Sequence, residues 1–205
     1  DASLEMVGGK GRSLAKMAAA GLPVPYGYHL TTSAYRRFVE ENNMRATMLE
    51  LARPSIIQKT LSFEPASASI QALFEEAELP AEIITEIRQA YGALSESEPA
   101  VAVRSSANAE DLPDLSFAGQ HETYLNVRGE EALLAAVRRC WASAWTARAL
   151  SYRHQMGVDH GDVAMAVVVQ VMVPAEVSGI LFTANPATGE RSEMIVNASF
   201  GLGEA

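Results

Sequence analysis

The chain is poor in the residues that make disulfides and metal sites. It has one cysteine, Cys140, among 205 residues, so no disulfide can form within it. Its four histidines follow no metal-ligand spacing, and no signal-like apolar segment opens the chain. These features predict a protein of the reducing cytoplasm, with His29, His121, His154 and His160 as structural or surface residues.

Positive charge is also scarce. The chain contains 16 Lys and Arg residues and 25 Asp and Glu residues, giving a net charge of -9. This composition lacks the basic field that nucleic acids or anionic membranes require, so neither is an expected partner, although a local basic pocket is compatible with it. The hydrophobic share of 48% excludes global disorder and allows one large domain or two small lobes.

Composition divides the chain near residues 95–99. We expect an N-terminal lobe (1–98), with a glycine-lysine turn and a helical connector, and a mixed α/β lobe (99–205). Because the chain opens without Met and stops at a Gly-rich turn, we expect it to be part of something longer, truncated at its C-terminal side. Trp141 and Trp145 are expected in the core.

Hydrophobic periodicity predicts an alternation of helices and strands. Val101, Val103, Val167, Val169, Ile180 and Phe182 are expected to offer apolar strand faces that helices cover. One helix is predicted directly after Gly11, a second begins at 32 or 33, and two more span 130–144 and 146–156. The predicted strands are 28–31, one that ends at Arg104, 122–127, 163–173, 177–184 and 193–199.

Lys10 stands among Gly8, Gly9 and Gly11, directly before a predicted helix. Bare backbone amides and the positive end of the helix can bind a phosphate there, and the ammonium adds charge. The segment is not a P-loop, because Leu4 stands where the first Gly of that motif belongs and Gly11 follows the lysine. A flexible turn with a solvated lysine also explains the pattern, and the residues alone favour that plainer interpretation.

Arg104 ends an apolar segment and precedes Ser105 and Ser106, so we expect a rigid strand to hold its guanidinium beside two hydroxyls. A guanidinium fork suits phosphate oxygens. A structural salt bridge to Glu110 or Asp111 accounts for the same arginine equally well. The spacing does not choose between the two interpretations.

Two further segments can approach a nucleotide through their backbones. The loop 107–120 ends in small residues that let amides meet a phosphate, although its carboxylates are interpreted as surface charges. The apolar run 167–173 ends at Pro174, so backbone groups near 171–173 can lack strand partners and meet a purine edge. A buried strand leading to a turn is the plainer alternative.

Six short motifs occur in a fixed order along the chain. They are VGGKG (7–11), GLPVP (21–25), AVRSSA through EDLP to SFAGQ (102–120), QVMV (170–173), SGILFT (178–183) and GLGE (201–204). Together they resemble the N-terminal ATP-binding domain of the phosphoenolpyruvate synthase and pyruvate phosphate dikinase family, which includes rifampin phosphotransferase.

The resemblance implies an α+β, ATP-grasp-like nucleotide-binding domain, incomplete at its C-terminal side. In that family the matching lysine and arginine contact the ATP phosphates and serve catalysis, a loop closes over them, and a strand end borders the adenine. The implied residues are Lys10 and Arg104 at the phosphates, Gly119 and Thr123 in the loop, and Gln170, Met172, Val173 and Pro174 beside the adenine.

By this resemblance the parent is an ATP-dependent phosphotransferase that moves the β-phosphoryl of ATP to a carrier histidine and on to pyruvate. Its Mg²⁺ ligands, histidine-carrier domain and acceptor-substrate domain are expected outside this chain, which alone is expected to be inactive. Two alternatives stay open. One is rifampin phosphotransferase, which residues 140–143 and 198–205 also fit, and the other is a non-catalytic nucleotide-binding module, against which the retained Lys10 and Arg104 count.

Overall fold

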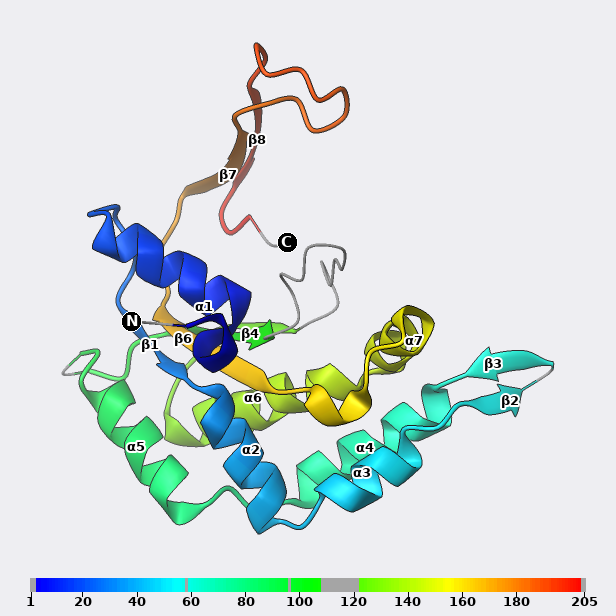
Figure 1. Cartoon of the computed structure of the whole chain (residues 1–205). Helices are drawn as coiled ribbons and strands as arrows, with labels where there is room; N and C mark the ends of the chain where they lie inside the picture. Colours follow the sequence, from blue (N-terminus) through cyan, green and yellow to red (C-terminus); the bar gives the residue numbers. More distant parts are fainter. Residues whose placement is uncertain (1–2, 58, 96, 108–121, 204–205) are drawn as a thin grey trace. The chain divides into compact units, whose positions relative to one another are not determined.

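The computed structural model describes residues 3–57, 59–95, 97–107 and 122–203. It divides into two compact units, Asp1–Met172 and Val173–Ala205. The larger unit combines helices with antiparallel strands (Figure 1). Its helices are α1 (Leu4–Ala19), α2 (Thr32–Glu41), α3 (Arg45–Leu51), α4 (Glu64–Glu76), α5 (Ala81–Gly92), α6 (Glu130–Ala142) and α7 (Ala147–Met156), with 3₁₀ turns η1 (Ser143–Trp145) and η2 (His160–Asp162).

The main sheet has the strand order β1-β6-β4-β5, and every neighbouring pair is antiparallel. Strand pairing therefore joins the N-terminal segment to strands that lie far along the chain. The expected lobes 1–98 and 99–205 do not coincide with the two units, because β1 of the first lobe and β6 of the second share one sheet. The strands are β1 (Gly27–Leu30), β4 (Val101–Ala107), β5 (Thr123–Val127) and β6 (Met165–Val171), with a separate small hairpin of β2 (Ser55–Ile57) and β3 (Thr60–Ser62).

The two faces of this sheet have different environments, since alternate residues of a strand point to opposite sides. Val101 and Val103 of β4 and Val167 and Val169 of β6 are buried in the core with residues of α2, α4, α5 and α6. The alternate residues, including Ser106, face α1, which lies on the other side of the sheet from α6 (Figure 1). The predicted apolar faces of these two strands are confirmed.

Aromatic rings fill the centre of the core. The ring of Phe38 lies 5.0 Å from that of Trp141 and 5.6 Å from that of Phe74, measured between centroids. The indole N–H of Trp145 donates to the hydroxyl of Tyr35 at 2.9 Å, so this buried polar group is satisfied. Both tryptophans are core residues, as the sequence predicted.

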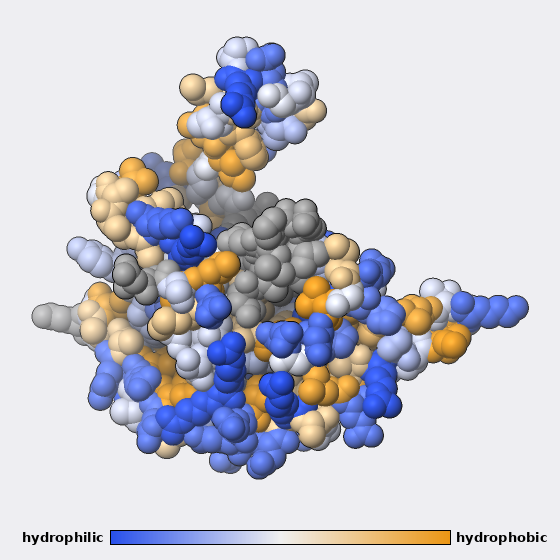
Figure 2. All heavy atoms as spheres, viewed as in Figure 1, coloured by the Kyte–Doolittle hydropathy of each residue, from blue (hydrophilic) through white to orange (hydrophobic). Residues whose placement is uncertain are grey.

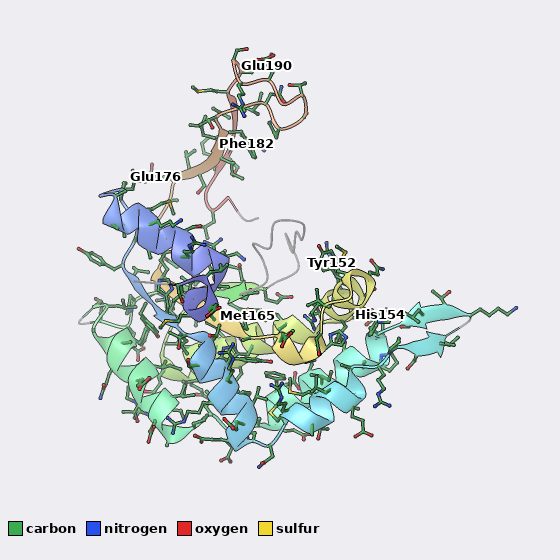
Figure 3. All side chains as sticks on the ribbon, in the orientation of Figure 1. Tyr152, His154, Met165, Glu176, Phe182 and Glu190 are labelled. Carbon is green, nitrogen blue, oxygen red and sulfur yellow. The ribbon has the colours of Figure 1, made fainter. Side chains whose placement is uncertain are left out.

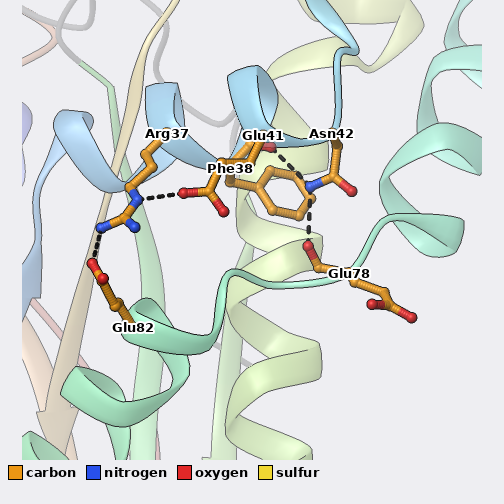
Figure 4. Close-up of polar contacts among 6 residues, drawn as sticks. All are labelled: Arg37, Phe38, Glu41, Asn42, Glu78 and Glu82. Atoms are coloured by element: carbon orange, nitrogen blue, oxygen red, sulfur yellow. Dashed lines mark hydrogen bonds and ion pairs between the residues drawn. The ribbon is translucent and has the colours of Figure 1, made fainter.

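Polar contacts fix α2 against the helical connector (Figure 4). The guanidinium of Arg37 pairs with Glu82 of α5, an exposed ion pair that contributes little to stability. Asn42 follows the end of α2, and its Nδ2 donates to the carbonyls of Phe38 at 2.9 Å and Glu78 at 3.0 Å. These two bonds hold the segment between α4 and α5 against the end of α2.

One predicted strand is longer than expected. The strand expected to end at Arg104 continues to Ala107, because Ser105, Ser106 and Ala107 pair with β6 as regularly as the preceding residues do. The other predicted elements of this unit are present, with ends that differ by a few residues, but the hairpin of β2 and β3 was not predicted and lies within the connector expected to be helical. Among the described residues, no helix combines the length and the apolar character that crossing a membrane requires.

The smaller unit contains an antiparallel hairpin of β7 (Val177–Phe182) and β8 (Ile195–Phe200). Its apolar side chains are open to solvent: Ile180 is 56% exposed, Phe182 41% and Phe200 93% (Figures 2 and 3). The described residues of this unit include no helix, so the expectation that helices cover Ile180 and Phe182 stays a prediction. A two-stranded hairpin by itself has marginal stability, and within the described part of this unit these side chains form no buried core.

A buried arginine in α7 is held by aromatic and imidazole groups. The Nε of Arg153 donates to Nδ1 of His160 at 3.1 Å, and its guanidinium lies 5.3 Å from the ring centroid of Trp145. Burial lowers the pKa of Arg153 to about 10. Burial, together with the charge of Arg153, lowers the pKa of His160 to about 4. His160 is therefore neutral at physiological pH.

This arrangement predicts a pH dependence of stability. Between the unfolded pKa of 6.5 and the folded pKa of about 4, the unfolded state binds the additional proton, so His160 destabilises the fold as pH falls. We expect the melting temperature of the wild type to fall more steeply across this window than that of His160→Asn, which keeps an acceptor for Arg153. Calorimetric scans at a series of pH values measure both. Parallel curves above about pH 7 are the internal control, and parallel curves throughout would contradict the prediction.

Candidate functional site

Helix α1 is interrupted two residues before Lys10. Gly8 has φ 68° and ψ -179°, a conformation essentially restricted to glycine. Regular helix resumes after it and continues to Ala19, so Lys10 lies in the first turn of the longer helical segment. The predicted glycine turn leading into a helix is confirmed, except that a short helical segment beginning at Leu4 precedes the glycines.

The buried hydroxyl of Ser106 holds this turn against β4. Its Oγ donates to the carbonyl of Val7 at 2.7 Å and accepts from the amide of Gly11 at 3.1 Å. The same close approach requires Gly8, because a Cβ there would lie 2.2 Å from the carbonyl oxygen of Ser106. The expectation of bare amides in this turn is wrong for Gly11, whose N–H is bonded within the protein.

Arg104 lies within β4 and is partly exposed, paired with Thr123 of β5 and Val168 of β6. Val168 is paired in turn with His29 of β1. Opposite residues of antiparallel strands carry their side chains on the same face, so these four form a row across the sheet. Ser106 is two residues beyond Arg104 and hence also on this face, which is the one that α1 covers.

The fold thus brings the turn of Lys10 beside the strand of Arg104, with Thr123 directly opposite the arginine. Two cations and a hydroxyl on one face of a sheet can bind a phosphate-bearing anion. Gly119 lies outside the described residues, as do Glu110 and Asp111, the expected alternative partners of Arg104.

Gln170 lies on the same face of the sheet, but its side chain has an internal partner. Its Nε2 donates to the carbonyl of Pro25 at 3.2 Å. It also lines a hollow of about 250 Å³ together with Leu14 and Ala18 of α1 and Val168 of β6. The Gln170 amide is therefore part of the contact between β6, α1 and the segment that leads into β1.

The strand end after Gln170 is more regular than expected. The amide of Val171 donates to the carbonyl of Tyr26 at 2.8 Å, and that of Met172 donates to Ala100 at 2.9 Å. The expectation that these backbone groups lack strand partners is therefore wrong for both N–H groups. Val173 and Pro174 belong to the smaller unit, where Val173 is 53% exposed.

The thiol of Cys140 is unreactive in this environment. Its thiol is buried, and burial, with a smaller effect of Glu122, raises its pKa to about 12, although Arg139 and Lys10 act in the opposite direction. The thiolate, which is the reactive form, is absent at neutral pH. In the described parts of the chain, no three His, Cys, Asp or Glu side chains gather closely enough to hold a metal ion.

Sequence reasoning missed the role of Ser106 at this site. The sequence pattern predicts two hydroxyls beside the guanidinium of Arg104, whereas in the structure both serines donate to backbone carbonyls, Ser105 to Glu122 at 3.1 Å and Ser106 to Val7. The contacts of Ser106 join residues 95 and 99 positions apart. No local pattern carries a signal for such a contact.

Comparison with known proteins identifies relatives along nearly the whole chain. A family model described as "Pyruvate phosphate dikinase, AMP/ATP-binding domain" matches residues 4–205. A probable phosphoenolpyruvate synthase of Pyrococcus abyssi is 44% identical, over 98% of this chain and 29% of that protein. The phosphoenolpyruvate synthases of Aeropyrum pernix and Pyrococcus furiosus are 46% and 44% identical over 98% of this chain, and over 25% and 29% of their own lengths.

The chain therefore spans less than a third of the length of these relatives. The family match nevertheless covers almost all of it, including the turn of Lys10 and the strand of Arg104. The chain belongs to the family of pyruvate phosphate dikinase AMP/ATP-binding domains.

Proposed function

We propose that this chain is the ATP-binding part of a longer phosphotransferase of the phosphoenolpyruvate synthase type. In this proposal the β-phosphoryl of ATP passes to a carrier histidine, leaving AMP, and then to pyruvate. The family description and the names of the relatives support it, as does the greater length of those relatives. The carrier and acceptor domains, which are the proposed partners, lie outside this chain, and the proposed compartment is the cytoplasm.

The observation that carries the proposal is the position of the Lys10 turn beside the strand of Arg104, on one face of the sheet. Both cations sit on regular secondary structure, so they can stabilise charge on a phosphoryl group with little reorganisation. Thr123 lies opposite Arg104 and adds a hydroxyl that can donate to a phosphate oxygen. These three groups are the proposed phosphate contacts.

The remaining contacts follow from the family. Mg²⁺ neutralises phosphate charge when bound, and we assign its carboxylate ligands to segments outside this chain. The chain alone is accordingly proposed to bind ATP weakly and to form no AMP. The acceptor rifampin is not favoured, because the relatives named above are phosphoenolpyruvate synthases. Gly119 is the further proposed loop contact, and Gln170, Met172, Val173 and Pro174 are the proposed adenine contacts.

Replacing Lys10 by methionine tests the phosphate assignment. We expect Lys10→Met to weaken Mg-ATP binding by the full-length protein about tenfold or more, because a charged phosphate contact is lost. The melting temperature should stay close to that of the wild type, since the turn is held by backbone contacts to Ser106. Isothermal titration calorimetry measures the affinity.

Lys16→Met is the matched control, since it makes the same change in charge at an exposed position in the last turn of the same helix. Its affinity for Mg-ATP should equal that of the wild type. Unchanged affinity of Lys10→Met, or equal losses in both variants, would show that Lys10 makes no specific phosphate contact.

A further inference from the structure

The hydroxyl of Ser106 spans the turn that carries Lys10. It donates to the carbonyl of Val7, just before the break at Gly8, and accepts from the amide of Gly11, directly after Lys10. Ser106 is fully buried, so water does not compete for these bonds. Val7 and Gly11, which flank the segment from Gly8 to Lys10, are thus both hydrogen-bonded to the Oγ of Ser106.

The same strand carries the second cation of the proposed site. Arg104 and Ser106 are two residues apart on one face of β4, about 7 Å along the strand. Both residues are paired with β6, Arg104 with Val168 and Ser106 with Ala166. Strand β4 is therefore a rigid support, and Ser106 is its polar link to the turn of Lys10.

The close packing at Gly8 adds a second constraint. A Cβ at Gly8 would lie 2.2 Å from the carbonyl oxygen of Ser106 and 2.4 Å from its Oγ, so backbone and hydroxyl meet without space between them. Gly11 is also confined, though less tightly, since a Cβ there would lie 2.9 Å from the Cβ of Val7. Ser106 of β4 confines the turn at Gly8, and Val7 of the preceding helical segment confines it at Gly11.

We propose that Ser106 is a positioning residue that fixes Lys10 relative to Arg104 for binding the phosphates of the nucleotide. This inference rests on the proposed function, because it assigns Ser106 an effect on ATP through Lys10. The neighbouring Ser105 offers a matched comparison: it is equally buried, and its hydroxyl donates to the carbonyl of Glu122, on the other face of β4.

A double-mutant cycle in the full-length protein tests the proposal. Mg-ATP affinity is measured by calorimetry for Ser106→Ala, Ser105→Ala, Lys10→Met and the pair Ser106→Ala/Lys10→Met. We expect Ser106→Ala to weaken binding about tenfold and Ser105→Ala less than about twofold. In the Lys10→Met background, Ser106→Ala should have almost no further effect, because the group that it positions is absent.

Two results would overturn the inference: wild-type affinity in folded Ser106→Ala, or the same fold loss from Ser106→Ala with and without Lys10. If Ser106→Ala does not fold, Ser106→Cys takes its place, since a thiol is a weaker donor, and the same outcomes decide.

A measurement without nucleotide separates this inference from the proposed function. Amide hydrogen exchange in residues 7–11 should accelerate in Ser106→Ala and stay unchanged in Ser105→Ala. If Lys10→Met leaves ATP affinity unchanged, the proposed role of Lys10 fails, while faster exchange in Ser106→Ala still shows that Ser106 orders the turn. Exchange unchanged in Ser106→Ala would overturn the positioning role even if Lys10 binds ATP.

Discussion

Replacing Arg104 by alanine in the full-length protein is expected to lower ATP-dependent AMP formation about 10²–10³-fold, the usual effect of removing one preorganised charge partner. Arg104 lies within β4, and its neighbours on β5 and β6 fix its backbone. The proposed phosphates would therefore lose a contact that costs no reorganisation when the phosphoryl group moves. Arg104→Lys is expected to recover only part of the rate, because an ammonium lacks the planar fork that binds two phosphate oxygens.

Folding is expected to survive this substitution, because the backbone hydrogen bonds of β4 do not depend on the side chain at 104. Arg88→Ala is the control: it also removes a guanidinium, but one that forms an exposed ion pair with Glu130. Its rate of AMP formation should equal that of the wild type. A rate for Arg104→Ala within a factor of two of the wild type would mean that this arginine plays no part in binding the transferred phosphoryl group.

Gly8→Ala is expected to have the largest effect on stability. The alanine would have to adopt φ 68° and ψ -179°, which costs about 1–3 kcal/mol. Its Cβ would also meet the backbone carbonyl of Ser106 at 2.2 Å, so helix α1 or strand β4 must move. We expect a loss of at least about 3 kcal/mol, corresponding to a drop in melting temperature of about 6–12 °C for a domain of this size.

Gly21→Ala separates the two causes. Gly21 also has a positive φ, 76°, but a Cβ there meets nothing within 4 Å. Its substitution should therefore cost only the backbone term, about 1 kcal/mol. Scanning calorimetry of both variants measures the difference, and equal losses would show that the contact with Ser106 does not constrain position 8. Since Gly8 adjoins the turn of Lys10, we also expect Gly8→Ala to weaken Mg-ATP binding.

The sequence by itself determined the local structure and the main composition of the core. Helical spacing predicted Trp141 and Trp145 in the core, and apolar alternation predicted the buried face of Val101 and Val103. The glycines around Lys10 indicated a turn before a helix, because few other residues tolerate such a backbone. These features depend on residues within one or two turns of each other, and so a single sequence contains their signal.

Only the tertiary structure decided which distant residues meet. The pairing of β1 with β6, of β6 with β4 and of β4 with β5 aligned His29, Val168, Arg104 and Thr123 in one row. Periodicity says which face of a strand is apolar, but register and strand order arise from packing over the whole unit. The link from Ser106 to the turn of Lys10 has the same origin, since a hydroxyl finds its partners 95 and 99 residues away only when α1 packs on β4.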